Sequence, residues 1–543
     1  MDHLTERIWY RSYTSEMKEK LVIPEKSIYT LFKETVEKYG ERSAVIYNGQ
    51  TTTYSELKNR VDRLASAWKQ IGMNKGENIG LMISNHPNYM ICFFAAQLLG
   101  MTVVPINPRV NNRELLKLMI DSEMKYLVIE QYSSLDPCEL LRDSQFLEQL
   151  FISGIKPIDK FRTLDHLIEQ VEPIRKEATI SVREDIAVIQ YTFCATGNTK
   201  RVMLSHYNIV ANVIQNCMTN AKRLKFGEEM IVTAVPLYHI YGLTTAMNLG
   251  VYIGATLLLF PKFDVKSVLE NIKKYQPTYF PGVPYMYSAF IDYPNVENYG
   301  LECLKNCTSG SIPYPSEVIK RFEAITGTTI IEGYGVEEVS SITHRTPPDG
   351  LRKIGSIGVP LPGTDCLIVD EDSNELPPKF PGELLIKGPQ IMNNYWKNEE
   401  ASKLKLRNGW LYTGDLAIMD EDGYFFIIGQ KEEVVIMGGF NISVQEVEKV
   451  LNEYPEIEEA FVFGIPDPRY GEVMKGLIVP KKGRQIDIED VKGYCHLNLK
   501  SHKVPKFFEI RQGLPRNSVG KLLKKTLIDE EKNRIKGSEK NEL

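Results

Sequence analysis

Short apolar runs alternate with amphipathic stretches of helical period from near the N-terminus to about residue 340. Residues 53–72 begin with the capping-box sequence Thr-Tyr-Ser-Glu, continue with apolar residues at helical spacing and end in glycine, which predicts a helix. The runs 78–83 and 126–129 are short and apolar, as in strands buried on both faces. Because successive parallel strands need a crossover, and helices supply it, this alternation predicts an α/β fold with parallel sheets covered by helices.

The chain of 543 residues is longer than a single hydrophobic core normally organises, so two or more domains are expected. Hydrophobic residues make up 43% of the chain, which is enough to build those cores. The formal net charge is -5, so the protein has no general attraction for nucleic acid.

The N-terminal residues 1–20 carry charges where a secretory signal has an apolar stretch, and no apolar run approaches the roughly 20 residues that span a bilayer. We therefore expect a cytoplasmic protein without an integral membrane segment. The eight cysteines are scattered, and the pair Cys303 and Cys307 has no second pair or histidine nearby. We interpret them as reduced packing residues.

The pattern changes after about residue 355, where turns marked by glycine and proline replace the helical stretches. Residues 418–428 are typical of a strand, an Asp-Gly turn and a second strand, which predicts a small antiparallel sheet. Residues 429–433 are polar and charged between two apolar strands, so we interpret them as an interdomain hinge.

These boundaries predict a large N-terminal domain at 1–428, built of βα subdomains plus the small antiparallel β subdomain. A small, mobile α+β C-terminal domain is expected at 434–530. Residues 531–543 are nearly all polar and are predicted to be a disordered tail.

Residues 186–192 are typical of a strand, residues 194–200 form a polar turn, and Ser205 is placed to cap a following helix. A loop with Thr, Gly and Lys between a strand and a helix can present a hydroxyl, backbone N–H groups and an ammonium to phosphate oxygens. The loop lacks the Walker pattern, so by itself it is a weak signal, and an ordinary connecting loop is the favoured interpretation.

Other segments follow this loop in a fixed order along the chain: PLYHIYG at 236–242, FPGVP at 280–284, SGSIP at 309–313, YGVEE at 334–338, GWLYTGD at 409–415 and PRNSVGK at 515–521. Together with the loop they resemble the motifs of the adenylate-forming superfamily, which contains acyl-CoA synthetases, luciferases and the adenylation domains of peptide synthetases. The resemblance extends from about residue 27 to residue 527.

The resemblance implies an acid–thiol ligase that joins a carboxylic acid to ATP, giving an acyl-adenylate and pyrophosphate, and then transfers the acyl group to the thiol of CoA. This chemistry brings two anions together, so positive groups must be preorganised around them. By resemblance, Lys521 neutralises the carboxylate and the α-phosphate, Glu338 holds Mg²⁺, and His239 lies between the acyl pocket and the thiol entrance.

The resemblance also implies a nucleotide site in which Thr196 and Lys200 contact the triphosphate, Tyr334 stacks on adenine and Asp415 accepts hydrogen bonds from the ribose hydroxyls. The full set that it assigns to the nucleotide is Thr196, Gly197, Lys200, Ser309, Gly310, Ser311, Tyr334, Gly335, Glu337, Asp415 and Gln430.

Lys521 lies far beyond the predicted hinge, so it reaches the site only when the small domain docks. The resemblance implies a rotation about Glu432 between the two half-reactions, and it assigns Gly438, Gly439 and Phe440 to the tunnel for the pantetheine arm of CoA.

Without their motifs, some of these residues have plainer interpretations. Lys521 would be a solvated lysine in a basic stretch, Asp415 a turn aspartate and His239 a core histidine. His206 follows the helix cap, no nucleophile motif accompanies it, and we interpret it as structural.

Several positions depart from the family pattern. Residues 193–195 are Phe-Cys-Ala where the family has Ser-Gly-Thr, Thr199 replaces a proline and Arg201 a glycine, which predicts a weaker grip on phosphate. Glu337 replaces a threonine and adds a carboxylate near the triphosphate, and Gln430 replaces the arginine at the start of the hinge. Three alternatives stay open: a working ligase, a catalytically impaired relative that binds nucleotide or acyl groups, and a ligase that loads an acyl carrier protein.

The segment 241–247, which follows His239, is apolar and contains small residues. We therefore expect room for a medium- or long-chain acyl group rather than for acetate.

Overall fold

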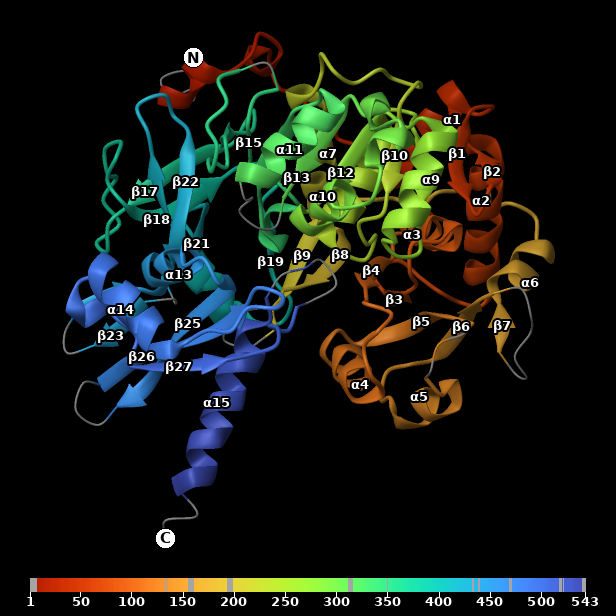
Figure 1. The fold of residues 1–543 in the computed structure, drawn as a ribbon. Coiled ribbons are helices and arrows are strands. Elements are labelled where there is room, and N and C mark those ends of the chain that lie inside the picture. The colour runs from red at the N-terminus through yellow and green to blue at the C-terminus, as the bar shows by residue number, and fades with distance from the viewer. Residues whose placement is uncertain are drawn as a thin grey trace.

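The structure is a computed structural model. It describes residues 7–131, 133, 135–154, 161–192, 199–310, 316–348, 350–431, 434–437, 440–467, 471–516, 520 and 522–539. Figure 1 shows a large body formed by the N-terminal three quarters of the chain and a small C-terminal domain beside it.

Two large, mostly parallel sheets form the body, as the apolar runs predicted. The first has the order β16 (Val359–Pro360), β15 (His344–Arg345), β14 (Ile330–Tyr334), β13 (Asn306–Ser309), β12 (Tyr279–Gly282), β10 (Met230–Thr233), β11 (Thr256–Leu259), β1 (Ser43–Tyr47) and β2 (Gln50–Thr53). The second has the order β19 (Asn394–Tyr395), β9 (Arg201–Ser205), β8 (Ile186–Tyr191), β4 (Thr102–Pro105), β3 (Asn78–Met82), β5 (Met124–Glu130), β6 (Gln149–Ser153) and β7 (Arg162–Thr163).

Helices connect and cover these strands. They are α1 (Ile28–Tyr39), α2 (Tyr54–Gln70), α3 (Pro87–Leu99), α4 (Asn112–Asp121), α5 (Pro137–Asp143), α6 (Leu164–Glu169), α7 (His206–Thr219), the π-helix η4 (Gly242–Asn248), α8 (Leu249–Tyr252), α9 (Val265–Tyr275), α10 (Pro284–Ile291) and α11 (Ser316–Thr326). None of the helices in the described part of the chain is both long and apolar enough to cross a bilayer.

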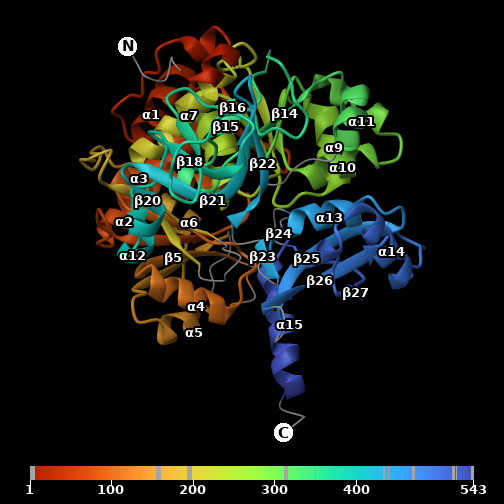
Figure 2. The ribbon, with the colours of Figure 1, turned by 90° about the vertical axis from the view of Figure 1, so that its left-hand side faces the viewer.

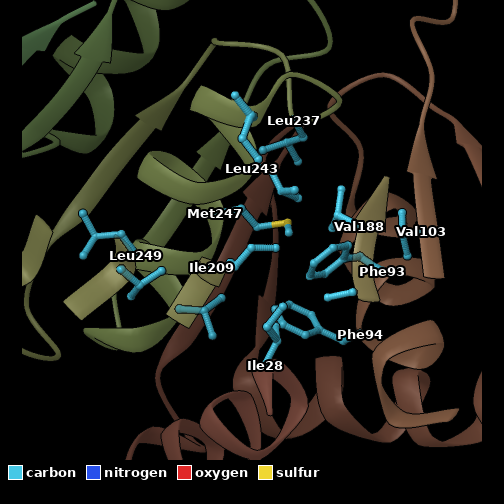
Figure 3. Packing of buried hydrophobic residues seen from close by; sticks show 14 of the residues in the cluster. Ile28, Phe93, Phe94, Val103, Val188, Ile209, Leu237, Leu243, Met247 and Leu249 are labelled. Carbon is cyan, nitrogen blue, oxygen red and sulfur yellow. The ribbon is translucent and has the colours of Figure 1, made fainter. Parts of the chain in front are cut away.

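The sequence prediction for α2 is confirmed in detail. Thr53 and Glu56 form the reciprocal capping box, and the apolar stripe that includes Leu57 and Trp68 is fully buried. Figure 3 shows the adjoining core, in which Phe93 and Phe94 of α3 meet residues of α7 and η4 such as Ile209. α3 is buried on nearly every side, because it lies where the helices of both sheets come together.

The connection after β8 differs from the prediction. We expected a strand, a loop and then a helix, but β9 intervenes and pairs antiparallel with β8. Val202 and Leu204 are buried while Arg201 and Met203 are half-buried, which is the alternation of a strand with one face on a core. β8 and β9 are therefore antiparallel neighbours, and α7 begins only after β9, at the capping box of Ser205 with Asn208.

The predicted antiparallel subdomain is present. It consists of β17 (Asp365–Val369), β18 (Gly382–Lys387), β20 (Leu406–Arg407), β21 (Trp410–Met419) and β22 (Phe425–Gln430), with α12 (Glu399–Lys405) beside it. The Asp-Gly turn lies between β21 and β22, where the sequence placed it. Gly429 and Gln430, which we assigned to the hinge, are the last residues of β22.

The C-terminal domain contains β23 (Val434–Met437), β24 (Phe440–Ser443), β25 (Ile457–Asp467), β26 (Gly471–Pro480) and β27 (Phe507–Ile510) with α13 (Val444–Asn452), α14 (Ile488–Asn498) and α15 (Lys524–Glu539). Figure 2 shows this domain below the antiparallel sheet, with α15 extending away from both domains.

The prediction of a disordered tail from residue 531 is wrong for residues 531–539, which continue α15. Two contacts of this helix were invisible in the sequence. Leu527 is buried in an apolar cluster, and Glu531 accepts a 2.7 Å hydrogen bond from the buried Lys475 ammonium. Because these anchors fix one face of the helix, its polar remainder follows as helix.

Candidate active site

The carboxyl ends of β13 and β14 lie side by side, since Ser309 is the Cα partner of Glu332 in the parallel pair. Gly310 and Gly335 follow these strand ends. A Cβ added at Gly335 would lie 1.8 Å from the Ser341 carbonyl oxygen, so only glycine fits. Ligands of open α/β sheets bind beyond the carboxyl ends of such strands, which makes this edge the first candidate for a site.

Asp415 of β21 faces the same edge and has a partner on each carboxylate oxygen. Oδ2 accepts a hydrogen bond from the Tyr334 hydroxyl, and Oδ1 accepts one of 2.9 Å from Gln430 Nε2. Asp415 and Gln430 are cross-strand partners of β21 and β22. Burial, together with the Asp415 charge, raises the pKa of Tyr334 well above its ordinary value, so the phenol remains a donor. Three residues that the sequence assigned to the nucleotide therefore form one hydrogen-bonded group.

Glu337 and Glu338 follow on the short 3₁₀ turn η7 (Glu337–Val339). The Tyr395 hydroxyl donates a 2.7 Å hydrogen bond to Glu338 Oε1. Burial and then the Glu337 charge raise the pKa of Glu338, and the hydrogen bond from Tyr395 opposes them. Glu337 Oε1 lies 3.8 Å from Nε2 of His239, so the carboxylate that departs from the family pattern faces the predicted thiol entrance.

Tyr395 was not found from the sequence, because no motif surrounds it and its partner lies 57 positions earlier. It also connects Lys200 to the site, since the Lys200 ammonium lies 5.1 Å from the centre of the Tyr395 ring. β19, which carries Tyr395, pairs with β9, and this pairing brings the two residues together.

Glu383 is a second residue that sequence reasoning missed. Its Oε1 accepts a hydrogen bond of 3.1 Å from the backbone N–H of Gly414, and its Oε2 lies 3.1 Å from the Lys431 ammonium. Lys431 belongs to the segment that we interpreted as a hinge. Glu383 therefore links Lys431 of that segment to the part of β21 that carries Asp415.

Mg²⁺ suits the carboxylates at this site. It is commonly held by one or two carboxylates, several waters and substrate phosphates, and does not need an all-protein cage. Glu338, with Glu337 beside it, offers such oxygen donors, and no group of three or more His, Cys, Asp or Glu side chains in the described part of the chain could hold a metal by itself. When bound with ATP, the ion supplies neutralisation of phosphate charge.

Some predicted residues lie outside the described residues: Thr196, Gly197, Ser311, Glu432, Gly438, Gly439 and Lys521. Phe440 begins β24. Gly520, the residue before Lys521, lies against the N-terminal domain, because a Cβ added there would stand 3.0 Å from Cδ1 of Tyr285 in α10. The C-terminal domain therefore meets the body at this position.

His206 has the structural place expected for it. It is buried, and its Nδ1 accepts a hydrogen bond of 3.3 Å from the backbone N–H of Ile28. Burial lowers its pKa to about 4, so it is neutral at physiological pH.

A carboxylate aligned by a tyrosine and a glutamine, a buried glutamate on the turn after β14 and glycines beyond the ends of two parallel strands suit a nucleotide-binding site of the kind found in adenylate-forming enzymes. Residues 32–396 match the family described as AMP-binding enzyme, and residues 446–521 match the AMP-binding enzyme C-terminal domain. The chain belongs to this family and is an AMP-forming acid–thiol ligase, which uses ATP, CoA and Mg²⁺.

Similar proteins cover nearly the whole chain. The long-chain-fatty-acid–CoA ligase of Bacillus subtilis (strain 168) is 34% identical, with 97% of this chain and 98% of that protein covered. The enzyme of the same name from Escherichia coli O6:H1 is 31% identical, with 97% and 99% covered. The o-succinylbenzoate CoA synthetase of Bacillus subtilis, solved with its acyl-adenylate intermediate, has a TM-score of 0.80 at 26% identity, with 93% and 98% covered.

Proposed function

We propose that the protein activates a medium- or long-chain fatty acid as its acyl-adenylate and transfers the acyl group to CoA. The contact of Asp415 with Tyr334 and Gln430 carries this proposal, because it presents an aligned carboxylate of the kind that ribose hydroxyls require. The fatty-acid class is supported by the names of the relatives above and by the apolar segment after His239.

Roles for individual residues are part of the proposal. Lys521 provides the ammonium that offsets the repulsion between the acid and the α-phosphate, and Glu338 binds the Mg²⁺ of the nucleotide. Tyr395 holds the Glu338 carboxylate in place, and Lys200 adds positive charge next to it.

The test measures pyrophosphate release and acyl-CoA formation with saturated acids of graded chain length. Lys521→Ala is expected to reduce acid-dependent ATP turnover by at least about 100-fold, since one preorganised charge typically contributes that factor. Lys481→Ala is the matched control, because this lysine is exposed in the same domain and its ammonium donates a hydrogen bond to the Pro455 carbonyl. Undiminished turnover in Lys521→Ala would contradict the proposal.

The same assay identifies the acyl acceptor and shows whether the enzyme is active. If the thioester forms on a holo-acyl carrier protein but not on free CoA, the acceptor is a carrier protein and not CoA. ATP binding without pyrophosphate release for any acid would identify a catalytically impaired relative.

A further inference from the structure

Arg345 of β15 is a buried cation without a counter-ion. Only 1% of its surface is exposed, and its Nε and Nη1 are buried without a hydrogen-bond partner. Within the part of the chain that the structure describes, no carboxylate forms an ion pair with it. A guanidinium keeps its charge at physiological pH, and a desolvated, unpaired charge is costly. An anionic group of a bound ligand would pair with this guanidinium and offset that cost.

The neighbouring carboxylate of Glu332 does not serve as this anion. Arg345 is the antiparallel partner of Gly333, so the two lie on one face of the sheet, and Glu332 points to the other. Burial raises the pKa of Glu332 to about 7, and the charges that act on it are those of Arg352 and Glu323. Glu332 therefore belongs to the α11 side of the sheet.

Arg345 lies next to the active-site edge. A Cβ added at Gly333 would be 4.0 Å from Arg345 Nε, and one added at Gly310 would be 3.8 Å from Cε2 of Tyr241 and 3.9 Å from the Gly333 carbonyl oxygen. Burial raises the pKa of Tyr241, and the Arg345 charge acts on it in the opposite direction. Gly333 therefore adjoins Arg345, Gly310 adjoins Tyr241, and the two glycines lie next to each other.

The segment that we expected to leave room for the acyl chain forms η4, which packs on β10 and α7. Figure 3 shows Leu243 and Met247 of η4 pointing into the core toward Phe93. Thr245 points the other way, since its Oγ1 shares a 3.0 Å hydrogen bond with Ser341 Oγ in the loop before β15. The Thr245 and Ser341 hydroxyls therefore lie between η4 and the loop that leads into β15, four residues before Arg345, and such polar groups suit an acid with a second polar end.

We infer that Arg345 binds a second carboxylate of the substrate, so that the preferred acid is an α,ω-dicarboxylic acid. A guanidinium matches a carboxylate in shape and charge, and a buried pair of this kind is specific because the cation is otherwise unpaired. The inference rests on the proposed function for the reacting carboxyl group and adds a requirement at the far end of the chain.

The experiment compares each dicarboxylic acid of 4, 6, 8, 10 and 12 carbons with the monocarboxylic acid of the same length. For the preferred length, the wild-type kcat/KM is expected to favour the diacid by about 10- to 150-fold, the range for a hydrogen bond to a charged group. Arg345→Met should abolish this preference while its KM for ATP stays unchanged. Arg352→Met is the matched control, because Arg352 pairs with Glu323 on the other side of the sheet, and it should retain the preference.

A second readout does not depend on catalysis. The melting temperature is measured with α,β-methylene-ATP and either acid, and the diacid is expected to stabilise the wild type more than the monoacid but not Arg345→Met. Because Met removes an unpaired buried charge, the variant without ligand should melt no lower than the wild type. Monoacids preferred at every length, or stabilisation by inorganic phosphate equal to that by the diacid, would overturn the inference. Acyl-CoA formation from monoacids would still leave the proposed function standing.

Discussion

Replacing Asp415 by alanine tests whether this carboxylate binds the ribose. In the wild type both carboxylate oxygens are engaged, by Tyr334 and by Gln430 at 2.9 Å, and the side chain is 6% exposed. A hydrogen bond to a charged acceptor contributes about 1.5–3 kcal/mol, so a bond to one ribose hydroxyl corresponds to about 10- to 150-fold in affinity. Asp415→Ala removes the acceptor and leaves two donors partly buried.

The assay is a double-mutant cycle between the protein and the nucleotide. Wild type and Asp415→Ala are each measured for KM with ATP and with 2′-deoxy-ATP. The wild type is expected to prefer ATP by at least about 10-fold, and the variant to discriminate by less than about 2-fold. Asp292→Ala, which removes an exposed carboxylate paired with Arg321, serves as the control and should behave as the wild type.

The cycle separates ribose binding from general damage. The two unpaired donors in Asp415→Ala are expected to lower the free energy of unfolding by about 1–3 kcal/mol each, which affects both nucleotides equally. If the variant still discriminated between the nucleotides as the wild type does, Asp415 would not contact the 2′-hydroxyl, and the placement of the ribose would be wrong.

Two further predictions concern stability. Lys475→Met should lower the free energy of unfolding by about 3–5 kcal/mol and expose α15 to proteolysis, because Glu531 and Glu509 lose the ammonium that lies 2.7 Å from each. Glu531→Gln should lower the free energy of unfolding by less. Equal protease resistance of the wild type and both variants would contradict this role of Lys475. For Glu332, the native pKa of about 7 lies above the ordinary 4.5, so the native state binds more protons and stability falls by about 3 kcal/mol as pH rises from about 4.5 to about 7. Glu332→Gln should flatten this pH dependence when the free energy of unfolding is measured by urea titration: the variant should be as stable as the wild type at pH 5 and more stable at pH 8. An unchanged pH dependence would refute the role of Glu332.

Local sequence determined much of the scaffold. The capping box at Thr53 begins α2, and the apolar runs form β3 and β5, because these patterns satisfy the backbone and bury apolar surface within a few residues. The sequence motif also singled out Gly335, and the structure explains why glycine is required there, since a Cβ would overlap the Ser341 carbonyl. Local patterns failed at the loop after β8, where alternation over only five residues concealed β9.

Contacts between distant segments were decided only by the tertiary structure. Tyr395 reaches Glu338, Glu383 reaches Lys431, and Lys475 anchors Glu531 across 48 to 57 positions of sequence. Whether a polar side chain is a solvated surface group or a buried one depends on which strands pair, and pairing is a property of the whole chain. Local sequence could not predict the environment of Arg345 either, because it is the register of β14 and β15 that turns Arg345 away from Glu332 and leaves its charge unpaired.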